Sequence, residues 1–202
     1  MPRDAYYEYF DDGKYCYPGT YVLRNKLGLT DSAELLEAER SITSIRIAQL
    51  DIDDSQYGKP FDAARLCEIH RFIFSDIYDW AGKYRTVNIS KGSMFCAFQY
   101  IPVQVDKLMA KLACESPLDA LSQHEIAVRL AYYLGEINAI HPFREGNGRT
   151  QRAFVRKLAY ENGWLLSFAN VSDNEMIEAS MQSFNGNNAK LEAVIEGGLR
   201  KL

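Results

Sequence analysis

The sequence contains no hydrophobic run of the 18 or more residues that a membrane-spanning helix needs. Its first twelve residues are acidic and rich in tyrosine, and they lack the apolar stretch of a secretory signal peptide. Cysteines are few, and they lie too far apart for the paired spacing of a disulfide framework or a zinc site: Cys16, Cys67, Cys96 and Cys114. These absences favour a reducing compartment, and we expect a cytoplasmic protein that does not contact a membrane.

Positive charge is not in excess either. The chain has 23 Lys and Arg against 27 Asp and Glu, which gives a net charge of −4. A mildly acidic protein is poorly suited to binding a nucleic-acid backbone, so we expect no direct contact with nucleic acid. Any binding of anions must therefore come from a local group of basic residues.

The chain has the length and composition of an ordinary globular domain. It has 202 residues, of which 47% are hydrophobic and 25% charged. No internal repeat or low-complexity segment is visible. We predict an irregular N-terminal arm over residues 1–30, followed by a single structural unit over residues 31–202.

Apolar spacing and capping signals predict a mainly α fold with about seven helices. Asp31 with Glu34, Ser122 with Glu125, and Ser172 with Glu175 have the spacing of capping boxes. The predicted helices cover residues 31–50, 61–76, 101–113, 122–141 and 148–162, a segment that begins at 172, and residues 189–201.

One segment has a β pattern. Residues 86–89 and 94–98 are two short β-prone runs around a turn that contains Gly92. We predict a β-hairpin there, packed across helices, since an isolated hairpin is only marginally stable.

A short loop with two glycines joins two of the predicted helices, in the sequence His141-Pro-Phe-Arg-Glu-Gly-Asn-Gly-Arg149. Glycine lets backbone N–H groups approach a ligand closely, and the next helix offers its free N-terminal N–H groups and its positive dipole. These features form an anion site. Arg149 and Arg152 are three residues apart on one helix face and suit a polyphosphate.

The same loop carries a base and a carboxylate. His141 can accept a proton near neutral pH. Glu145, beside bound phosphates, is placed to hold Mg²⁺. A base, a metal-binding carboxylate and phosphate-binding groups within twelve residues indicate transfer of a phosphate-containing group.

These residues match, at every fixed position, the signature His-x-Phe-x-(Asp/Glu)-Gly-Asn-Gly-Arg-x-x-Arg, and the chain resembles the Fic family. Residues 78–85 are similar to the stretch before that family's β-hairpin "flap", and residues 17–26 are similar to the N-terminal segment of bacterial Fic toxins. The likeness spans about residues 14–200. It implies a helical Fic fold with the flap over the active site.

The resemblance implies protein adenylylation: ATP and Mg²⁺ bind at the loop, and AMP is transferred to a hydroxyl group of a target protein. The counterpart of His141 in the family deprotonates that hydroxyl group, and the counterpart of Glu145 binds Mg²⁺. The remaining implied roles are a core anchor for Phe143, an anion hole of Gly146, Asn147 and Gly148, and contacts with the β- and γ-phosphates for Arg149 and Arg152.

The flap, about residues 87–98, is implied to pair with an extended target segment as an added strand. The residues expected to position the target are Val87, Asn88, Ile89, Phe95 and Ala97. The related Doc branch has lysine at the position of Gly148 and transfers phosphate, so the glycine favours AMP transfer.

Many Fic proteins carry an inhibitory helix with the motif (Ser/Thr)-x-x-x-Glu-(Gly/Asn). Thr30 to Glu34 fits five positions but is followed by Leu35, and the segment ending at Glu196 has Glu192 where Ser or Thr is required. The resemblance therefore implies the toxin of a toxin–antitoxin pair, inhibited by a small antitoxin protein that supplies the helix in trans. A degenerate internal inhibitor around Glu196 remains an alternative.

Two other functions stay open at this point. One alternative is a nucleotide-binding module without catalytic activity, although such a module needs no general base such as His141. The loop recognises phosphates, so transfer of another phosphate-linked group, UMP or phosphocholine, is a further alternative. The target is not readable from the sequence; the resemblance to Fic toxins points to a type II topoisomerase subunit.

Overall fold

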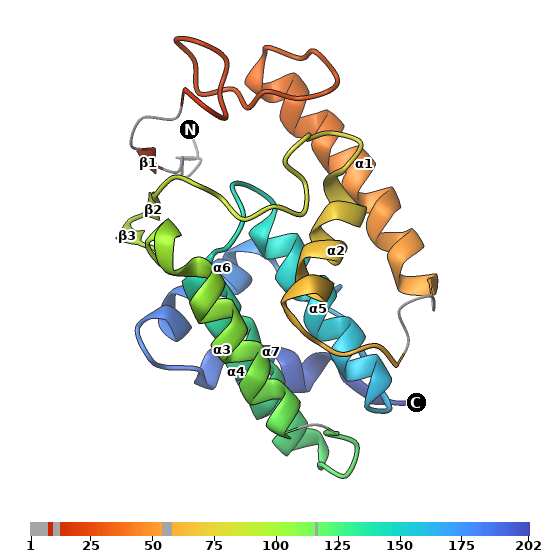
Figure 1. The fold of residues 1–202 in the computed structure, drawn as a ribbon. Helices are drawn as coiled ribbons and strands as arrows, with labels where there is room; N and C mark the ends of the chain where they lie inside the picture. The colour runs from red at the N-terminus through yellow and green to blue at the C-terminus, as the bar shows by residue number, and fades with distance from the viewer. Residues whose placement is uncertain (1–7, 10–12, 54–57, 116) are drawn as a thin grey trace.

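The computed structural model describes residues 8–9, 13–53, 58–115 and 117–202, and these residues form a mainly helical protein (Figure 1). The predicted fold class is confirmed, because the described residues contain seven α-helices and a short hairpin. The helices are α1 Ser32–Ile52, α2 Ala63–Phe74, α3 Ile101–Glu115, α4 Gln123–Ile140, α5 Asn147–Glu161, α6 Asp173–Phe184 and α7 Ala189–Gly198, with a 3₁₀ turn, η1, at Phe98–Tyr100.

Helix α5 lies at the centre of this arrangement. It packs against both α2 and α4, while α1 packs on α2, and α6 and α7 pack against α4 (Figure 1). Most of its side chains are buried, among them Phe154, Val155 and Leu158. The burial of apolar area on several sides fixes the position of its N-terminus, where the glycine loop begins.

Two of the three predicted capping boxes are present. Ser122 and Ser172 each accept a hydrogen bond from the backbone of the glutamate three residues on, and each glutamate bonds back. At α1 the Asp31 carboxylate accepts from the N–H groups of Ala33 and Glu34, but no return bond from the Glu34 side chain is present. Asp31 is therefore the helix N-cap, as its position in the sequence predicts, but the capping box with Glu34 is not formed.

The hairpin is present but shorter than predicted. Strands β2 Ile89–Lys91 and β3 Ser93–Met94 pair around Gly92, whose φ is 75°. Residues 86–88 and 95–98 lie outside the strands. Phe95 N–H still donates to Ile89 O, but the backbone groups of Thr86, Val87 and Phe98 bond to side chains, and Cys96 N–H donates to Ala139 O near the end of α4. Strand β1, Glu8–Tyr9, pairs with the other edge of β2.

A second small sheet was not predicted. Strand β4, Trp164–Leu166, pairs antiparallel with β5, Leu199–Lys201. The last helix therefore ends at Gly198 rather than at Lys201. Gly198 permits this close approach, since a Cβ atom there would lie 2.3 Å from the backbone oxygen of Ser167.

Part of the predicted N-terminal arm is described. Residues 13–31 contain no helix, and Tyr15, Cys16 and Leu23 are buried in the same core as the helices. Of the rest of the arm, Glu8–Tyr9 forms β1, and residues 1–7 and 10–12 lie outside the described residues. None of the described helices has the length and apolar character to cross a bilayer.

Candidate active site

His141 lies in the turn that ends α4. Its φ and ψ of 50° and 62° are left-handed, and it is the one non-glycine residue with positive φ in the described part of the chain. Its N–H donates to Ile137 O at 2.9 Å, and Pro142 follows it. A non-glycine residue in this region is unfavourable unless surrounding contacts hold it, and such residues gather at functional sites.

The hydrogen bonds of the His141 ring define which nitrogen acts as the base. Nδ1 lies 3.1 Å from the backbone oxygen of Asn138, which can only accept, so Nδ1 carries the proton and Nε2 the lone pair. The ring is buried and stacks on Phe95 with centroids 3.8 Å apart. Burial lowers the pKa of His141 to about 3, and Arg85 and Lys91 act in the same direction. The imidazole is therefore neutral, as a base must be, at neutral pH.

Hydrogen bonds between its own residues stabilise the turn after His141. Asn147 is buried, and its side-chain amide accepts from Phe143 N–H and donates to Phe143 O, both at 2.8 Å. Thr150 closes the next turn by donating to Gly146 O at 2.9 Å. The Asn147 side chain thus holds the loop, and what this residue offers an anion is its backbone N–H.

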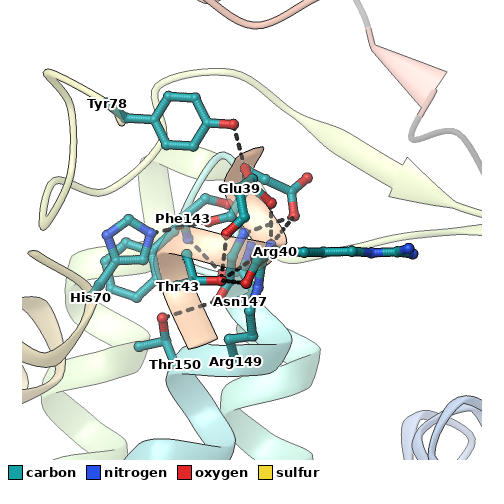
Figure 2. Close-up of polar contacts among 11 residues, drawn as sticks. Glu39, Arg40, Thr43, His70, Tyr78, Phe143, Asn147, Arg149 and Thr150 are labelled. Atoms are coloured by element: carbon teal, nitrogen blue, oxygen red, sulfur yellow. Dashed lines mark hydrogen bonds and ion pairs between the residues drawn. The ribbon is translucent and has the colours of Figure 1, made fainter. Parts of the chain in front are cut away.

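His70, from α2, holds the same turn from outside. Its Nδ1 accepts from Gly82 N–H at 2.8 Å, so its Nε2 donates to Glu145 O at 3.0 Å. Its ring stacks on Phe143, which is fully buried (Figure 2). Phe143, which was expected to anchor the loop, is thus buried against His70, and sequence spacing gave no sign of the His70 contact.

Gly146 is the N-cap of α5, with φ of 79°, and its Cα lies against the Phe74 ring. A Cβ atom there would lie 2.2 Å from Phe74 Cζ. The first N–H groups of α5, from Asn147, Gly148 and Arg149, have no acceptor within the helix. They form one wall of an anion site at the end of the helix.

The two arginines of the motif differ in their partners. Arg149 forms an ion pair with Glu39 of α1 and donates to Thr43 Oγ1 at 3.0 Å, while the Tyr78 hydroxyl also donates to Glu39 (Figure 2). Burial alone would lower the pKa of Arg149, but Glu39 and Glu145 outweigh it and raise that pKa. Arg149 therefore keeps its positive charge, which the Glu39 carboxylate balances. The motif did not indicate this ion pair.

No described residue makes an ion pair or hydrogen bond with Arg152, which faces a cavity of about 470 Å³ together with His141 and Gly148. Burial and the neighbouring Arg149 lower the pKa of Arg152, and the nearby Asp173 only partly offsets this. An anion in the cavity would relieve this unfavourable environment. The other residues that line the cavity are Lys91, Gly92, Ser93, Phe95, Asn138, Gln151, Met176, Ile177, Ser180, Met181, Phe184 and Asn185.

The remaining basic residues of this stretch point elsewhere. Arg144 is fully buried against Tyr15 and Cys16, Arg156 pairs with Asp51, and Lys157 donates to the backbone oxygen of Asp53. These three basic residues thus have separate partners and do not join Arg152 at the cavity.

Glu145 is about one quarter exposed beside the start of α5. Its Oε1 accepts from Gly146 N–H at 2.8 Å and lies 3.7 Å from Arg149. Burial and the nearby Glu39 raise the pKa of Glu145. The described residues form no cluster of three or more metal-ligating side chains. A single carboxylate next to an anion site does suit Mg²⁺, which takes further oxygen ligands from phosphates.

The residues predicted to position a target are not equally exposed. Phe95 lines the cavity, whereas Ile89 is buried, and Asn88 Oδ1 accepts from Phe98 N–H at 3.0 Å. Val87 O accepts from Arg85, and Ala97 precedes the 3₁₀ turn. The exposed residues of the flap are 91–94. Since β1 covers one edge of β2, the edge open to another strand among the described residues is that of β3.

Comparison with known proteins gives consistent matches. The sequence profile of the Fic/DOC family matches residues 60–159. The chain is 38% identical over 186 residues to protein adenylyltransferase VbhT of Bartonella schoenbuchensis, covering 92% of this chain but only 38% of that protein. It is 36% identical over 190 residues to the probable protein adenylyltransferase Fic of Salmonella typhimurium, covering 93% of both.

Solved structures share the fold. BepC of Bartonella tribocorum, a translocated effector protein solved with bound AMPPNP, superposes with a TM-score of 0.87 at 26% identity, over 93% of this chain and 97% of that one. The Fic domain of a Bartonella quintana effector with bound ADP also has a TM-score of 0.87, at 27% identity, over 93% and 94% of the two chains.

The close approach at Gly146 predicts a large loss of stability for Gly146→Ala. A left-handed alanine costs about 1–2 kcal/mol, and the overlap with Phe74 adds roughly 1–3 kcal/mol. The control is Gly186→Ala, because Gly186 has φ of 88° but a Cβ atom added there would meet no other atom within 4 Å. Chemical denaturation should show the larger loss at Gly146; equal losses would contradict the packing argument.

The low pKa of His141 predicts a pH-dependent stability. Because the folded-state pKa of about 3 lies below the usual 6.5, unfolding takes up a proton, and stability is lost as pH falls below 6.5. Between pH 7.5 and 5.5 this one group should lower the free energy of unfolding by about 1.4 kcal/mol. His141→Asn, which tolerates positive φ, should remove that part of the pH dependence. An unchanged slope in denaturation experiments would contradict it.

Proposed function

The chain belongs to the Fic/DOC family, and on that premise we propose that it is a protein adenylyltransferase, which transfers AMP from ATP to a hydroxyl group of a target protein. The observation that carries the proposal is the cavity where the neutral base His141, the N-terminus of α5 and the Arg152 guanidinium meet. That combination serves a reaction at a phosphate, since it offers a proton acceptor on one side and anion-binding groups on the other.

In the proposed reaction, His141 Nε2 takes the proton of the target hydroxyl. The hydroxyl oxygen then forms a bond to the α-phosphorus of ATP, and the bond from that phosphorus to the bridging oxygen of the β-phosphate breaks. Pyrophosphate leaves with the electron pair. The backbone N–H groups at the start of α5 and the Arg152 guanidinium stabilise the negative charge of the phosphates.

We further propose that Glu145 holds a Mg²⁺ ion together with the phosphates of ATP. Its partly exposed carboxylate lies beside the N-terminus of α5, where its Oε1 accepts from Gly146 N–H, and this position supports the assignment. When bound, the ion would neutralise phosphate charge and help to orient the leaving group.

The wall of the cavity opposite the loop supports a nucleotide as the ligand. Met176, Ile177, Met181 and Phe184 of α6 supply an apolar surface, and Phe184 packs edge-on against Phe95 with centroids 6.0 Å apart. A flat base suits such a surface. The chemistry at the phosphates would be the same for UMP or phosphocholine transfer, so labelled UTP belongs in the assay as a competitor.

We propose that the protein acts in the cytoplasm as the toxin of a toxin–antitoxin pair. A small antitoxin would supply a glutamate to Arg152, which forms no ion pair or hydrogen bond among the described residues. An internal inhibitor at Glu196 is disfavoured, since Glu196 pairs with His124 at the start of α4. The length of α4 places that pair roughly 25 Å from His141. A type II topoisomerase subunit is the first target to test.

The first test uses ATP labelled at the α- or the γ-phosphate, with purified topoisomerase subunits or a bacterial lysate. Label should move to protein from α-labelled ATP alone. His141→Asn should reduce transfer by at least about 100-fold, since a general base contributes 10²–10⁴-fold. His124→Ala, at the other end of α4, should retain wild-type transfer. Label from γ-labelled ATP alone, or undiminished transfer by His141→Asn, would refute the proposed function.

The second test separates the two motif arginines. Arg152→Ala should weaken ATP binding roughly tenfold or more in calorimetry, because a charge-assisted hydrogen bond contributes about 1.5–3 kcal/mol. Arg149→Met should instead lower the free energy of unfolding by about 3–5 kcal/mol, because it leaves buried Glu39 without its cation. Wild-type ATP affinity in Arg152→Ala would contradict this division of roles.

A further inference from the structure

Arg85 is a fully buried arginine whose guanidinium is surrounded by backbone oxygens. Its Nε donates to His141 O at 2.8 Å, and its Nη1 donates to Val87 O at 2.7 Å. Its Nη2 donates to Cys96 O and, at 3.2 Å, to Ile140 O. Its own backbone N–H donates to Pro142 O at 2.9 Å. These bonds join three separate parts of the chain at one side chain.

The environment of this cation is unusual. No described carboxylate forms an ion pair with Arg85, and burial lowers its pKa to about 10, so it stays charged at neutral pH. Buried charges normally require an opposite charge, and here several carbonyl dipoles take that place. Two of them, Ile140 O and His141 O, are at the C-terminus of α4, where helix carbonyls lack partners and the helix dipole is negative.

The two other acceptors are the ends of the flap. Val87 lies just before β2 and Cys96 just after β3, so one planar group fixes both ends of the hairpin relative to the turn at His141. Phe95, the neighbour of Cys96 in the chain, stacks on the His141 ring. Lysine could not replace them, because its three donors spread from one point, whereas the guanidinium has five donors in a rigid plane.

We propose that Arg85 is a positioning residue for the transfer reaction: its guanidinium holds His141 in its left-handed conformation and locks the flap to that turn. The proton acceptor and a target strand docked on the flap then keep one relative position. The reaction part of this inference rests on the proposed function. The conformational part does not.

The conformational part is tested by NMR on the full chain with ¹⁵N-labelled histidine. The sequence has three histidines, so the spectrum is simple, and His141→Asn assigns the signal. In the wild type at pH 7.5, His141 should be the Nδ1–H tautomer and His70 the Nε2–H tautomer. In Arg85→Met, His141 should become a mixture of tautomers while His70 is unchanged.

The matched control is Arg65→Met. Arg65 is also buried, but it pairs with Glu161 and donates to Lys59 O, away from the cavity. The Arg65→Met substitution should leave the His141 tautomer unchanged even if it destabilises the protein. Should Arg85→Met fail to fold, Arg85→Lys keeps the positive charge and should still produce the mixed tautomer. A pure Nδ1–H signal for His141 in whichever Arg85 variant folds would overturn the proposal.

The reaction part is tested by kinetics of AMP transfer with the same variants. Arg85→Lys should lower kcat on the order of 100-fold, as expected for a misplaced catalytic group, and raise KM for the target protein because the flap is released. Arg65→Met should change neither constant. Unchanged kcat in Arg85→Lys would overturn the positioning role. Absence of transfer by the wild type would refute the proposed function while leaving the NMR result to stand by itself.

Discussion

The turn between α4 and α5 is the constraint on which the site depends. The chain must reverse from the end of one helix to the start of the next while His141 stays in a left-handed conformation and Gly146 approaches an aromatic ring. Such a turn has backbone groups that its own helices cannot satisfy. Asn147 satisfies two of them from inside, and His70 and Arg85 satisfy others from α2 and from the segment before the flap. The surrounding helices are therefore needed for the shape of the loop.

Electrostatics within this site separate residues that are adjacent in the motif. Arg149 is balanced by Glu39, with Tyr78 and Thr43 completing the cluster, so its charge connects α1 to α5 (Figure 2). Arg152 has no such balance among the described residues and faces the cavity. Since an anion gains most from a cation that is not already held in an ion pair, this difference supports the proposal that Arg152 rather than Arg149 binds phosphate. The negative net charge of the chain is compatible with an anion site, because such a site needs only one available guanidinium and a helix N-terminus.

Sequence patterns predict helices better than strands in this chain. Ser122 and Ser172 mark helix starts correctly, because a cap depends on residues three positions apart. The predicted hairpin is in the right place but too long, since the backbone at Val87 and Cys96 is taken by Arg85 rather than by a strand. The β4–β5 sheet has no comparable local signal, because its pairing of Leu166 with Leu199 depends on contacts between distant segments.

The sequence by itself determined the chemistry: a base, a carboxylate, a glycine turn and arginines at fixed spacing around a helix start, which is enough to indicate transfer at a phosphate. The tertiary structure alone decided how those groups are used. It made His141 neutral by burial and chose its proton-bearing nitrogen through Asn138. It also paired Arg149 with a glutamate 110 positions away. Ionisation and pairing depend on which groups packing brings together and removes from water, and local spacing in a sequence does not contain that information.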